Sequence, residues 1–224
     1  MGVKRLTYYL NSAAPLDVYA ERSLIDYLVE MRRNYQHSDA PVLLIDGPSV
    51  LYDFYADLDF VCQGQYQKHV ANCQTFVNCV RDAVPDVRLV FVFDCDVTEQ
   101  KRPEWLASRS QATKDCEALL KRFKLDQDDD MIRRPANEDV DRQRQRPMTM
   151  VAEALLLKYQ LRCTVIVSPH GDADPALASL ARHFGPQRCL GVISADSDMC
   201  MYDMRDVPVL LSPFTCMYWY NNPT

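Results

Sequence analysis

The stretch that decides the fold is Cys189-Leu-Gly-Val-Ile-Ser-Ala-Asp-Ser-Asp-Met-Cys-Met-Tyr-Asp203. An apolar run of strand length is followed by small residues and then by two carboxylates two positions apart, Asp196 and Asp198. Open α/β sheets place their ligands beyond the carboxyl ends of their strands, so these two acids are positioned to hold a metal ion. The simpler alternative is that Ser194, Asp196 and Ser197 only cap the short helix that follows.

Three other apolar runs end in acid in the same way. Residues 42–45 precede Asp46-Gly-Pro, residues 87–93 precede Asp94-Cys-Asp96, and residues 163–167 precede a turn with Asp172 and Asp174. In a parallel sheet these carboxylates would converge on one edge. Two carboxylates about 4 Å apart repel by roughly 4 kcal/mol at an effective dielectric of about 20, so a cluster needs cations. Oxygen ligands favour Mg²⁺ or Mn²⁺, and a pair of such ions suits phosphodiester cleavage; the alternative is that each acid is an independent cap.

Apolar residues at helical spacing occupy the segments between these runs, at 20–35, 65–83 and 150–159. Asp174 followed by Pro175 predicts the N-cap of a further helix, which Gly185-Pro186 would end. Residues 207–211 are a candidate fifth strand. The alternation predicts an α/β fold with a mainly parallel central sheet and helices on both faces, in one domain spanning residues 1–224.

Residues 97–150 differ in composition from the rest of the chain. Between residues 101 and 124 there are seven basic side chains against three acids, whereas the whole chain has a net charge of −6. A solvated helix face is the usual interpretation of such a run, and contact with phosphates is the other. Trp105 could stack on a base, although helix packing is the commoner role of such a residue. Residues 126–147 are too polar to bury, and we expect a mobile loop there.

The composition also bears on the cellular compartment. The nine cysteines contain no C-x-x-C pair, which favours reduced, buried thiols over disulfides or a zinc site. The first residues lack the apolar core of a signal peptide, and no apolar run approaches the length of a membrane span. We therefore expect an intracellular protein, nuclear or cytoplasmic, with no membrane partner.

The motifs together resemble the flap endonuclease/XPG-type 5′-nuclease superfamily, which has a PIN-like fold, and most of all its asteroid-type branch. The resemblance runs nearly end to end and rests on these segments: Met1-Gly-Val-x-x-Leu6, Leu-Ile-Asp46-Gly-Pro, Val-Phe-Asp94, Lys101 to Arg109-Ser110, Gly-Asp172-Ala-Asp174, and Ser-Ala-Asp196-Ser-Asp198-Met-Cys. Any one of these motifs alone would be weak evidence, but their order and spacing are fairly specific.

The resemblance implies roles for particular residues. Six acids would bind two Mg²⁺ or Mn²⁺ ions; they are Asp46, Asp94, Asp172, Asp174, Asp196 and Asp198. Lys101 or Arg102, with Arg109, would contact the scissile phosphate, and residues 97–150 would form an arch or cap over the substrate. Gly2 would lie near the active site, and the substrate-binding set would be Gly2, Lys114, Lys121 and Arg122. Asp172 stands where flap enzymes usually have Glu, and the residues after Asp198 contain no helix-hairpin-helix element.

Three functions remain open at this point. The first is a divalent-metal-dependent, structure-selective nuclease acting on single-stranded or branched DNA or RNA. The second is a catalytically weak or inactive PIN-like module that binds protein or RNA partners. The third is a phosphatase of the haloacid-dehalogenase type, because Phe-Val-Phe-Asp94-Cys-Asp96-Val-Thr98 matches its nucleophile motif. That motif normally follows the first strand of its domain, whereas here an earlier strand ends in Asp46.

Overall fold

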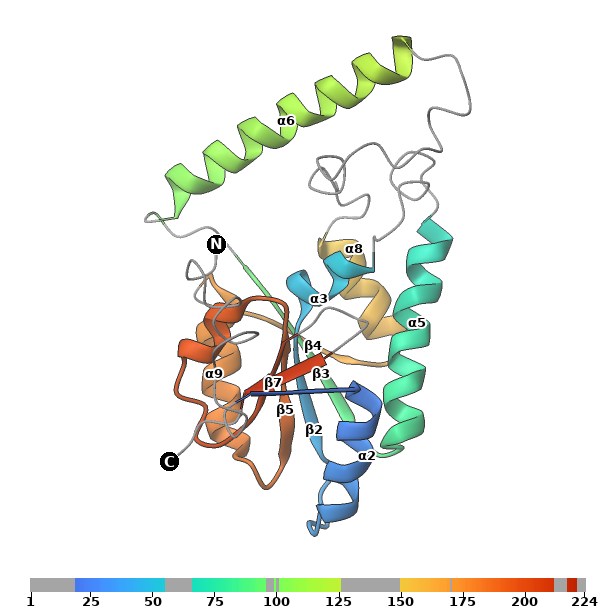
Figure 1. The fold of residues 1–224 in the computed structure, drawn as a ribbon, viewed down its shortest axis with the longest axis vertical. Helices are drawn as coiled ribbons and strands as arrows, with labels where there is room; N and C mark the ends of the chain where they lie inside the picture. Colours follow the sequence, from blue (N-terminus) through green and yellow to red (C-terminus); the bar gives the residue numbers. More distant parts are fainter. Residues whose placement is uncertain are drawn as a thin grey trace.

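A computed structural model of the chain describes residues 19–54, 66–95, 99, 101–125, 150–169, 171–211 and 217–220. Its centre is a seven-stranded sheet in the order β1-β7-β6-β5-β2-β3-β4 (Figure 1). The five strands from β6 to β4 are parallel, and β1 and β7 join antiparallel at the other side. The strands are β1 Tyr19–Arg22, β2 Val42–Asp46, β3 Arg88–Phe93, β4 Thr164–Val167, β5 Cys189–Ser194, β6 Val209–Leu211 and β7 Met217–Tyr220.

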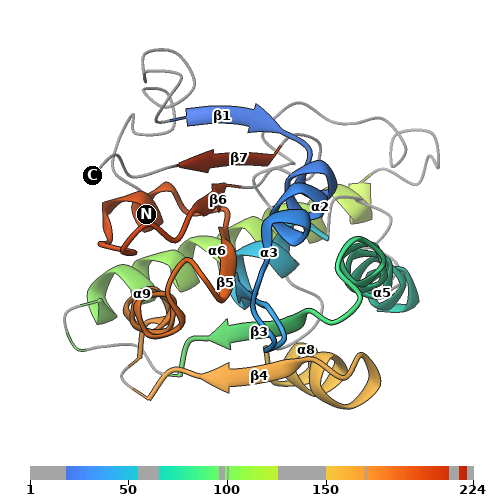
Figure 2. The same cartoon turned by 90° about the horizontal axis from the view of Figure 1, so that it is seen from below.

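Helices cover both faces of the sheet, as Figure 2 shows. One face carries α2 (Leu24–Asn34), α5 (Tyr66–Ala83) and α8 (Met150–Leu155), which continues as a π-helix, η2 (Leu156–Gln160), and the other carries α9 (Ala173–Phe184). Successive strand residues point to opposite faces, so Leu43 joins the core beneath α5 and Leu44 joins the core beneath α9. The predicted fold class, a mainly parallel sheet between two helical layers, is confirmed.

Two predicted helix starts were wrong. The helix expected over residues 20–35 begins at Leu24, and residues 19–22 form β1, which pairs with β7 near the other end of the chain. The helix expected to begin after Asp174 begins at Ala173, with Asp172 as its N-cap. Asp174 and Pro175 therefore lie in the first turn, where a residue without a backbone N–H is tolerated.

Gly47 sits where the chain turns from β2 into α3 (Gly47–Asp53). A β-carbon at this position would lie 2.9 Å from the ring of Phe93, which is buried at the end of β3. A side chain is therefore excluded by the close approach of the two strand ends, and this close approach brings Asp46 toward the end of β3.

A long helix, α6 (Arg102–Leu125), follows β3 and crosses above the carboxyl ends of the parallel strands (Figure 1). All of its side chains that the structure describes are exposed, and the role of residues 97–150 as an arch or cap stays a prediction. The loop expected over residues 126–147 lies outside the described residues.

The six described cysteines are free thiols, as the sequence predicts, but they are not all buried: Cys73, Cys163 and Cys189 are buried, Cys200 is half-buried, and Cys79 and Cys95 are exposed. Among the described residues, no helix has the length and apolar content that crossing a membrane requires.

Candidate functional site

The carboxyl ends of β2 and β5 mark the point where the order of the sheet reverses. From β2 the chain passes to β3 and then β4 on one side, and it returns to β5 and then β6 on the other. Such a switch point opens a crevice at the carboxyl edge of the sheet, because the connections leave in opposite directions. Asp46 ends β2 and Ser194 ends β5 at this switch point.

Two serines hold the buried carboxylate of Asp46. The Ser194 hydroxyl donates to Asp46 Oδ2 at 2.7 Å, and the backbone N–H of Ser49 donates to Asp46 Oδ1 at 3.3 Å, which makes Asp46 the N-cap of α3. The Ser49 and Ser194 hydroxyls lie 3.3 Å apart, and Ser49 Oγ accepts from the N–H of Ala195 at 3.1 Å. These hydrogen bonds join the ends of β2 and β5 and hold the Asp46 carboxylate in place.

Hydrogen bonds connect the turn after β4 to the end of β3, and Asp94 accepts one of them. Asp94 Oδ1 accepts from the N–H of Ala173 at 2.7 Å, and the Cys95 N–H donates to the Gly171 carbonyl at 2.9 Å. The Ser168 hydroxyl donates to the Asp172 carbonyl at 2.7 Å. These bonds place the first turn of α9, with Asp172 and Asp174, next to the end of β3.

Asp196 begins a short 3₁₀ helix, η3 (Ser197–Met201), directly after β5. Its Oδ1 accepts from the N–H of Asp198 at 2.9 Å, so the capping interpretation describes the local geometry of Asp196 correctly. Capping and ligation are compatible, because a carboxylate has two oxygens and about four lone-pair sites.

The negative charges of neighbouring acids nevertheless raise the pKa of two carboxyl groups at this edge. The pKa of Asp174 is raised to about 7, first by burial and then by the negative charges of Asp46, Asp196 and Asp172. Burial also raises the pKa of Asp46, and the bonds from Ser194 and Ser49 oppose that rise, while Asp94 adds to it. Acids at or beyond the ends of four strands therefore influence one another's ionisation.

Lys101 supplies a positive charge to this region from just before α6. Its ammonium group forms an ion pair with Asp172, and this bond, with the nearby charge of Asp174, raises the pKa of Lys101. Tyr202 is a further neighbour, because Asp174 and Asp172 add to the effect of burial in raising its pKa. Neither the Lys101–Asp172 pair nor Tyr202 is predicted from the sequence, since both depend on how the segments after β3 and η3 return to the edge.

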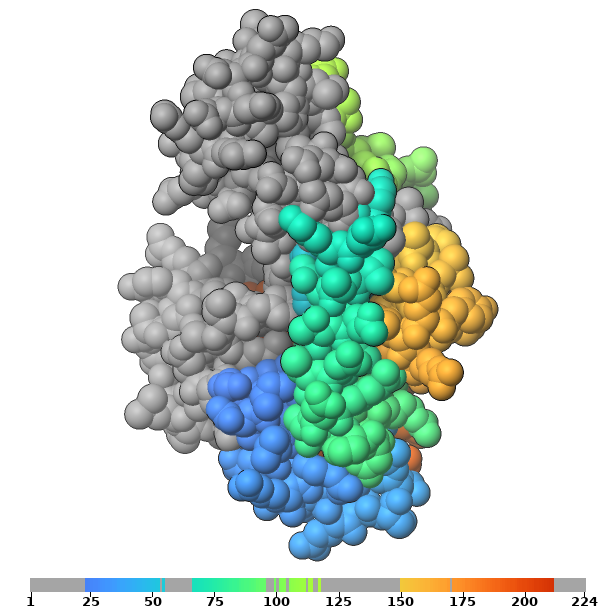
Figure 3. Space-filling model, turned by 90° about the vertical axis from the view of Figure 1, so that its right-hand side faces the viewer, coloured from blue at the N-terminus to red at the C-terminus, as the bar shows by residue number. Residues whose placement is uncertain are grey.

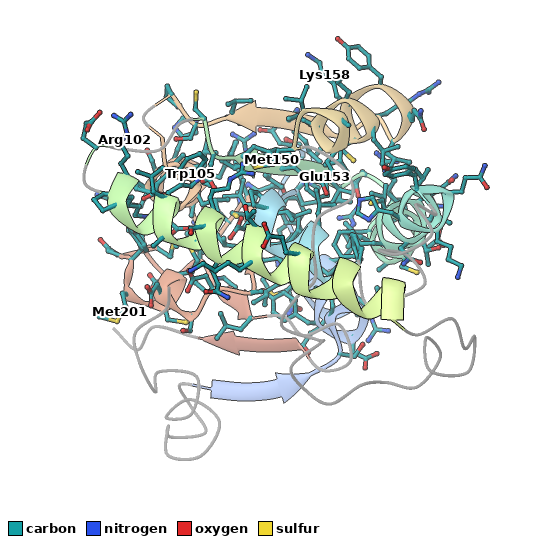
Figure 4. All side chains as sticks on the ribbon, turned by 90° about the horizontal axis from the view of Figure 1, so that it is seen from above. Arg102, Trp105, Met150, Glu153, Lys158 and Met201 are labelled. Atoms are coloured by element: carbon teal, nitrogen blue, oxygen red, sulfur yellow. The ribbon has the colours of Figure 1, made fainter. Side chains whose placement is uncertain are left out.

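The other predicted phosphate contacts lie along α6, away from the acids. Arg102 pairs with Glu99 at 3.2 Å, and the Arg109 guanidinium lies 4.9 Å from the centroid of the Trp105 ring. Figure 4 shows Arg102 and Trp105 on the α6 segment that crosses the edge of the sheet. Lys114 is exposed on the same helix. Gly2 and Asp96 lie outside the described residues, and the side chains of Lys121 and Arg122 are not described.

The donors at the edge are all oxygens, which is the ligand type that Mg²⁺ and Mn²⁺ prefer. Burial and then the repulsion of neighbouring acids raise the pKa of Asp174, and a bound cation would relieve that repulsion. In the described part of the chain, no group of three or more His, Cys, Asp or Glu side chains is arranged so that it could hold a metal ion. The fit to a cation therefore rests on donor type and on charge.

No protein-family model matches the chain. Curated relatives carry the name constitutive coactivator of peroxisome proliferator-activated receptor gamma. The mouse protein is 24% identical over 205 residues, covering 91% of this chain and 24% of the relative, and the human protein is 25% identical over 209 residues, covering 91% and 20%. The chain therefore spans about a quarter or less of the length of these relatives.

Solved structures give the class of fold. The catalytic core of Rad2 in complex with a DNA substrate superposes with a TM-score of 0.51 at 15% identity, over 98% of this chain and 55% of that one. Human GEN1 in complex with Holliday junction DNA gives a TM-score of 0.42 at 13% identity, over 98% and 44%. The likeness to the Rad2 core shows the fold of this chain, which is a PIN-like α/β fold.

Proposed function

We propose that the chain is a divalent-metal-dependent, structure-selective nuclease that hydrolyses phosphodiesters in single-stranded or branched nucleic acid. The observation that carries this proposal is the electrostatic coupling of acids from four strand ends at the switch point of the sheet. Bound Mg²⁺ or Mn²⁺, most simply two ions, would activate the attacking water and stabilise the leaving oxygen. The motifs that resemble the asteroid-type branch support assignment to that branch within the fold.

In this proposal, acids at the edge of the sheet bind the cations and basic residues of the arch contact the substrate. Asp46, Asp94, Asp174, Asp196 and Asp198 would hold the cations, with Asp172 as a sixth ligand when Lys101 releases it. We propose one domain over residues 1–224 with 97–150 as its arch. On that arch the phosphate contacts would be Lys101, Arg102 and Arg109, and the further substrate contacts would be Gly2, Lys114, Lys121 and Arg122.

Single-turnover cleavage tests this proposal. Labelled single-stranded DNA, single-stranded RNA and a flap duplex are incubated with excess protein in Mg²⁺ and in Mn²⁺. We expect cleavage of at least one substrate, and loss of about a hundredfold or more in Asp174→Asn and Asp196→Asn, the scale of a lost electrostatic contact to the reacting group. Asp206→Asn is the matched control, because Asp206 is exposed and its positive φ of 67° suits Asn.

A second candidate function is a PIN-like module without catalysis that binds protein or RNA. The Lys101–Asp172 ion pair favours it, because an ammonium group already neutralises one acid of the site. The named role of the relatives, coactivators, also supports a protein partner. Calorimetry separates the two: a folded chain that neither binds Mg²⁺ or Mn²⁺ nor cuts any substrate would exclude the nuclease.

The phosphatase hypothesis has its own discriminating variant. Asp96→Asn should abolish activity in a haloacid-dehalogenase-type enzyme, whereas the nuclease should tolerate it, because only Asp94 of that motif is expected to bind metal. Asp94 follows β3, whereas β2, which ends in Asp46, is the first of the five parallel strands along the chain and the middle one in the sheet.

A further inference from the structure

Exposed apolar side chains are concentrated in one stretch of the described chain. Of its ten exposed large apolar residues, five lie within residues 150–167. They are Met150 (39% exposed), Val151 (69%), Leu155 (50%), Tyr159 (68%) and Val167 (53%). Single exposed apolar residues are ordinary, whereas a contiguous group indicates an interaction surface.

Four of these five residues lie on one flank because of how α8, η2 and β4 pack. Ala154, Leu156 and Leu157 face the core beneath α5, which leaves Val151, Leu155 and Tyr159, four residues apart, on the outward side. Val165 packs against the same core, so Val167, two residues further along β4, points to the α8 side of the sheet. In the space-filling view this segment forms the outer flank beside α5 (Figure 3).

The same flank contains an open strand edge. β4 is the last strand of the sheet, and in the described part of the chain it pairs only with β3. Figure 2 shows β4 at the edge with α8 beside it. An edge strand presents outward-facing N–H and C=O groups that can accept another strand, and here an apolar strip lies next to them.

The charges of the segment 150–167 indicate which kind of partner this surface would bind. Its one acid, Glu153, is fully buried, whereas Lys158 and Arg162 are exposed. Figure 4 shows Lys158 projecting away from the body and Glu153 on the side of α8 that faces α5, and the Lys158 ammonium lies 5.4 Å from the Tyr159 ring centroid. A second copy of this chain, docked by two-fold symmetry, would bring like charges together. An acidic partner would meet complementary charge.

We propose that this α8–β4 flank is a docking surface for an extended peptide segment whose side chains on one face are apolar, with Asp or Glu among them. The segment adds to β4 as a further strand. Its apolar side chains lie against Val151, Leu155, Tyr159 and Val167, and its acids face Lys158 and Arg162. The surface uses none of the acids at the switch point, so it works whether or not the chain cuts nucleic acid.

Peptide selection tests the surface without a known partner. Random dodecapeptides displayed on phage are selected on the full chain and counter-selected on the Val151→Ser/Tyr159→Ser variant. We expect enriched peptides that carry apolar residues together with Asp or Glu at every second position, and increased hydrogen-exchange protection of the amides of 164–167 when a selected peptide binds. Affinity should fall about tenfold or more in the double variant, because about half the apolar contact is lost.

Two further variants keep the result interpretable. Lys158→Glu, at an exposed site, should weaken binding of the same peptides, and Leu106→Ser, an exposed apolar site on α6, should leave it unchanged. Peptides rich in Lys or Arg, protection away from β4, undiminished binding to the double variant, or no enriched peptide would each overturn the proposal. Dimerisation that Val151→Ser abolishes would also overturn it, in favour of a second copy.

Discussion

At the scale of single residues, the candidate acids serve both the fold and the site. Asp46 and Asp196 cap short helices, and Asp94 accepts the first N–H of α9. The sequence indicates that these acids lie at strand ends, because each follows an apolar run. It does not predict the Ser49–Ser194 contact at 3.3 Å, because that contact joins residues 145 positions apart.

The charge crowding at Asp174 gives a prediction about stability. Its pKa is raised from 3.8 to about 7, so ionisation is less favourable in the folded state than in the unfolded state. The folded chain in EDTA should therefore lose stability as the pH rises from about 4 through 7. Asp174→Asn should remove this dependence and stabilise the chain at pH 8 by on the order of 1 kcal/mol, after allowance for solvent screening at this half-exposed group.

Urea denaturation at pH 5 and pH 8 measures this effect. Mg²⁺ should stabilise the wild-type chain at pH 8 and should stabilise Asp174→Asn less, while Asp206→Asn should behave like the wild type in every condition. A wild-type chain that is more stable at pH 8 than at pH 5 in EDTA, with Asp174→Asn lowering that stability, would contradict the crowding argument.

Gly47 gives a second prediction at this scale. Gly47→Ala would place a β-carbon 2.9 Å from the Phe93 ring, so we expect a loss of about 1–3 kcal/mol of unfolding free energy, typical of overpacking. Phe93→Leu should offset part of that loss, because the smaller side chain vacates the space. A double-mutant cycle measures the coupling, and strictly additive effects would show that Phe93 is not the obstacle.

At the scale of elements, sequence patterns predict the strands and helices whose contacts are local. β2 and β5 appear as apolar runs because both of their faces are buried, whereas β4, at the edge of the sheet, is partly exposed. β1 is not recognised: the helical spacing begins only at Leu24, and residues 19–22 are extended because they pair with β7, nearly two hundred positions later. α9 begins at Ala173 because Asp94, a distant residue, accepts its first N–H.

The exposed helix α6 gives a prediction about nucleic-acid binding. If Arg109 neutralises one phosphate, Arg109→Gln should lower the slope of log K against log salt by about 1 and weaken binding to all sequences alike. Arg33→Gln, an exposed site on α2, is the matched control. Fluorescence anisotropy on single-stranded DNA and RNA across salt concentrations provides the measurement; an unchanged slope would remove Arg109 from the interface.

At the scale of the whole molecule, the two hydrophobic cores and the switch point of the sheet explain why acids far apart in the sequence lie at one edge. Each face of the sheet is covered by its own helices, and the parallel strands end at the same edge. The sequence predicts the order of the strands only in part. Local patterns do not determine that the chain returns from β4 to β5 on the far side of β2, because this return depends on contacts between distant residues. That return brings Ser194 to Asp46.

The Lys101–Asp172 ion pair links the arch to the sheet, and it gives opposite predictions for binding and for cleavage. Lys101→Gln removes a cation that competes for Asp172, so Mg²⁺ and Mn²⁺ should bind more tightly by a few-fold to about tenfold, as expected for loss of a partly exposed ion pair. Cleavage should become slower, because the same change removes a proposed phosphate contact. Arg102→Gln should leave metal affinity unchanged, since Arg102 pairs with Glu99. Calorimetry and single-turnover kinetics on the three proteins give both quantities, and weaker metal binding in Lys101→Gln would show that the ammonium supports the acid site rather than competing for it.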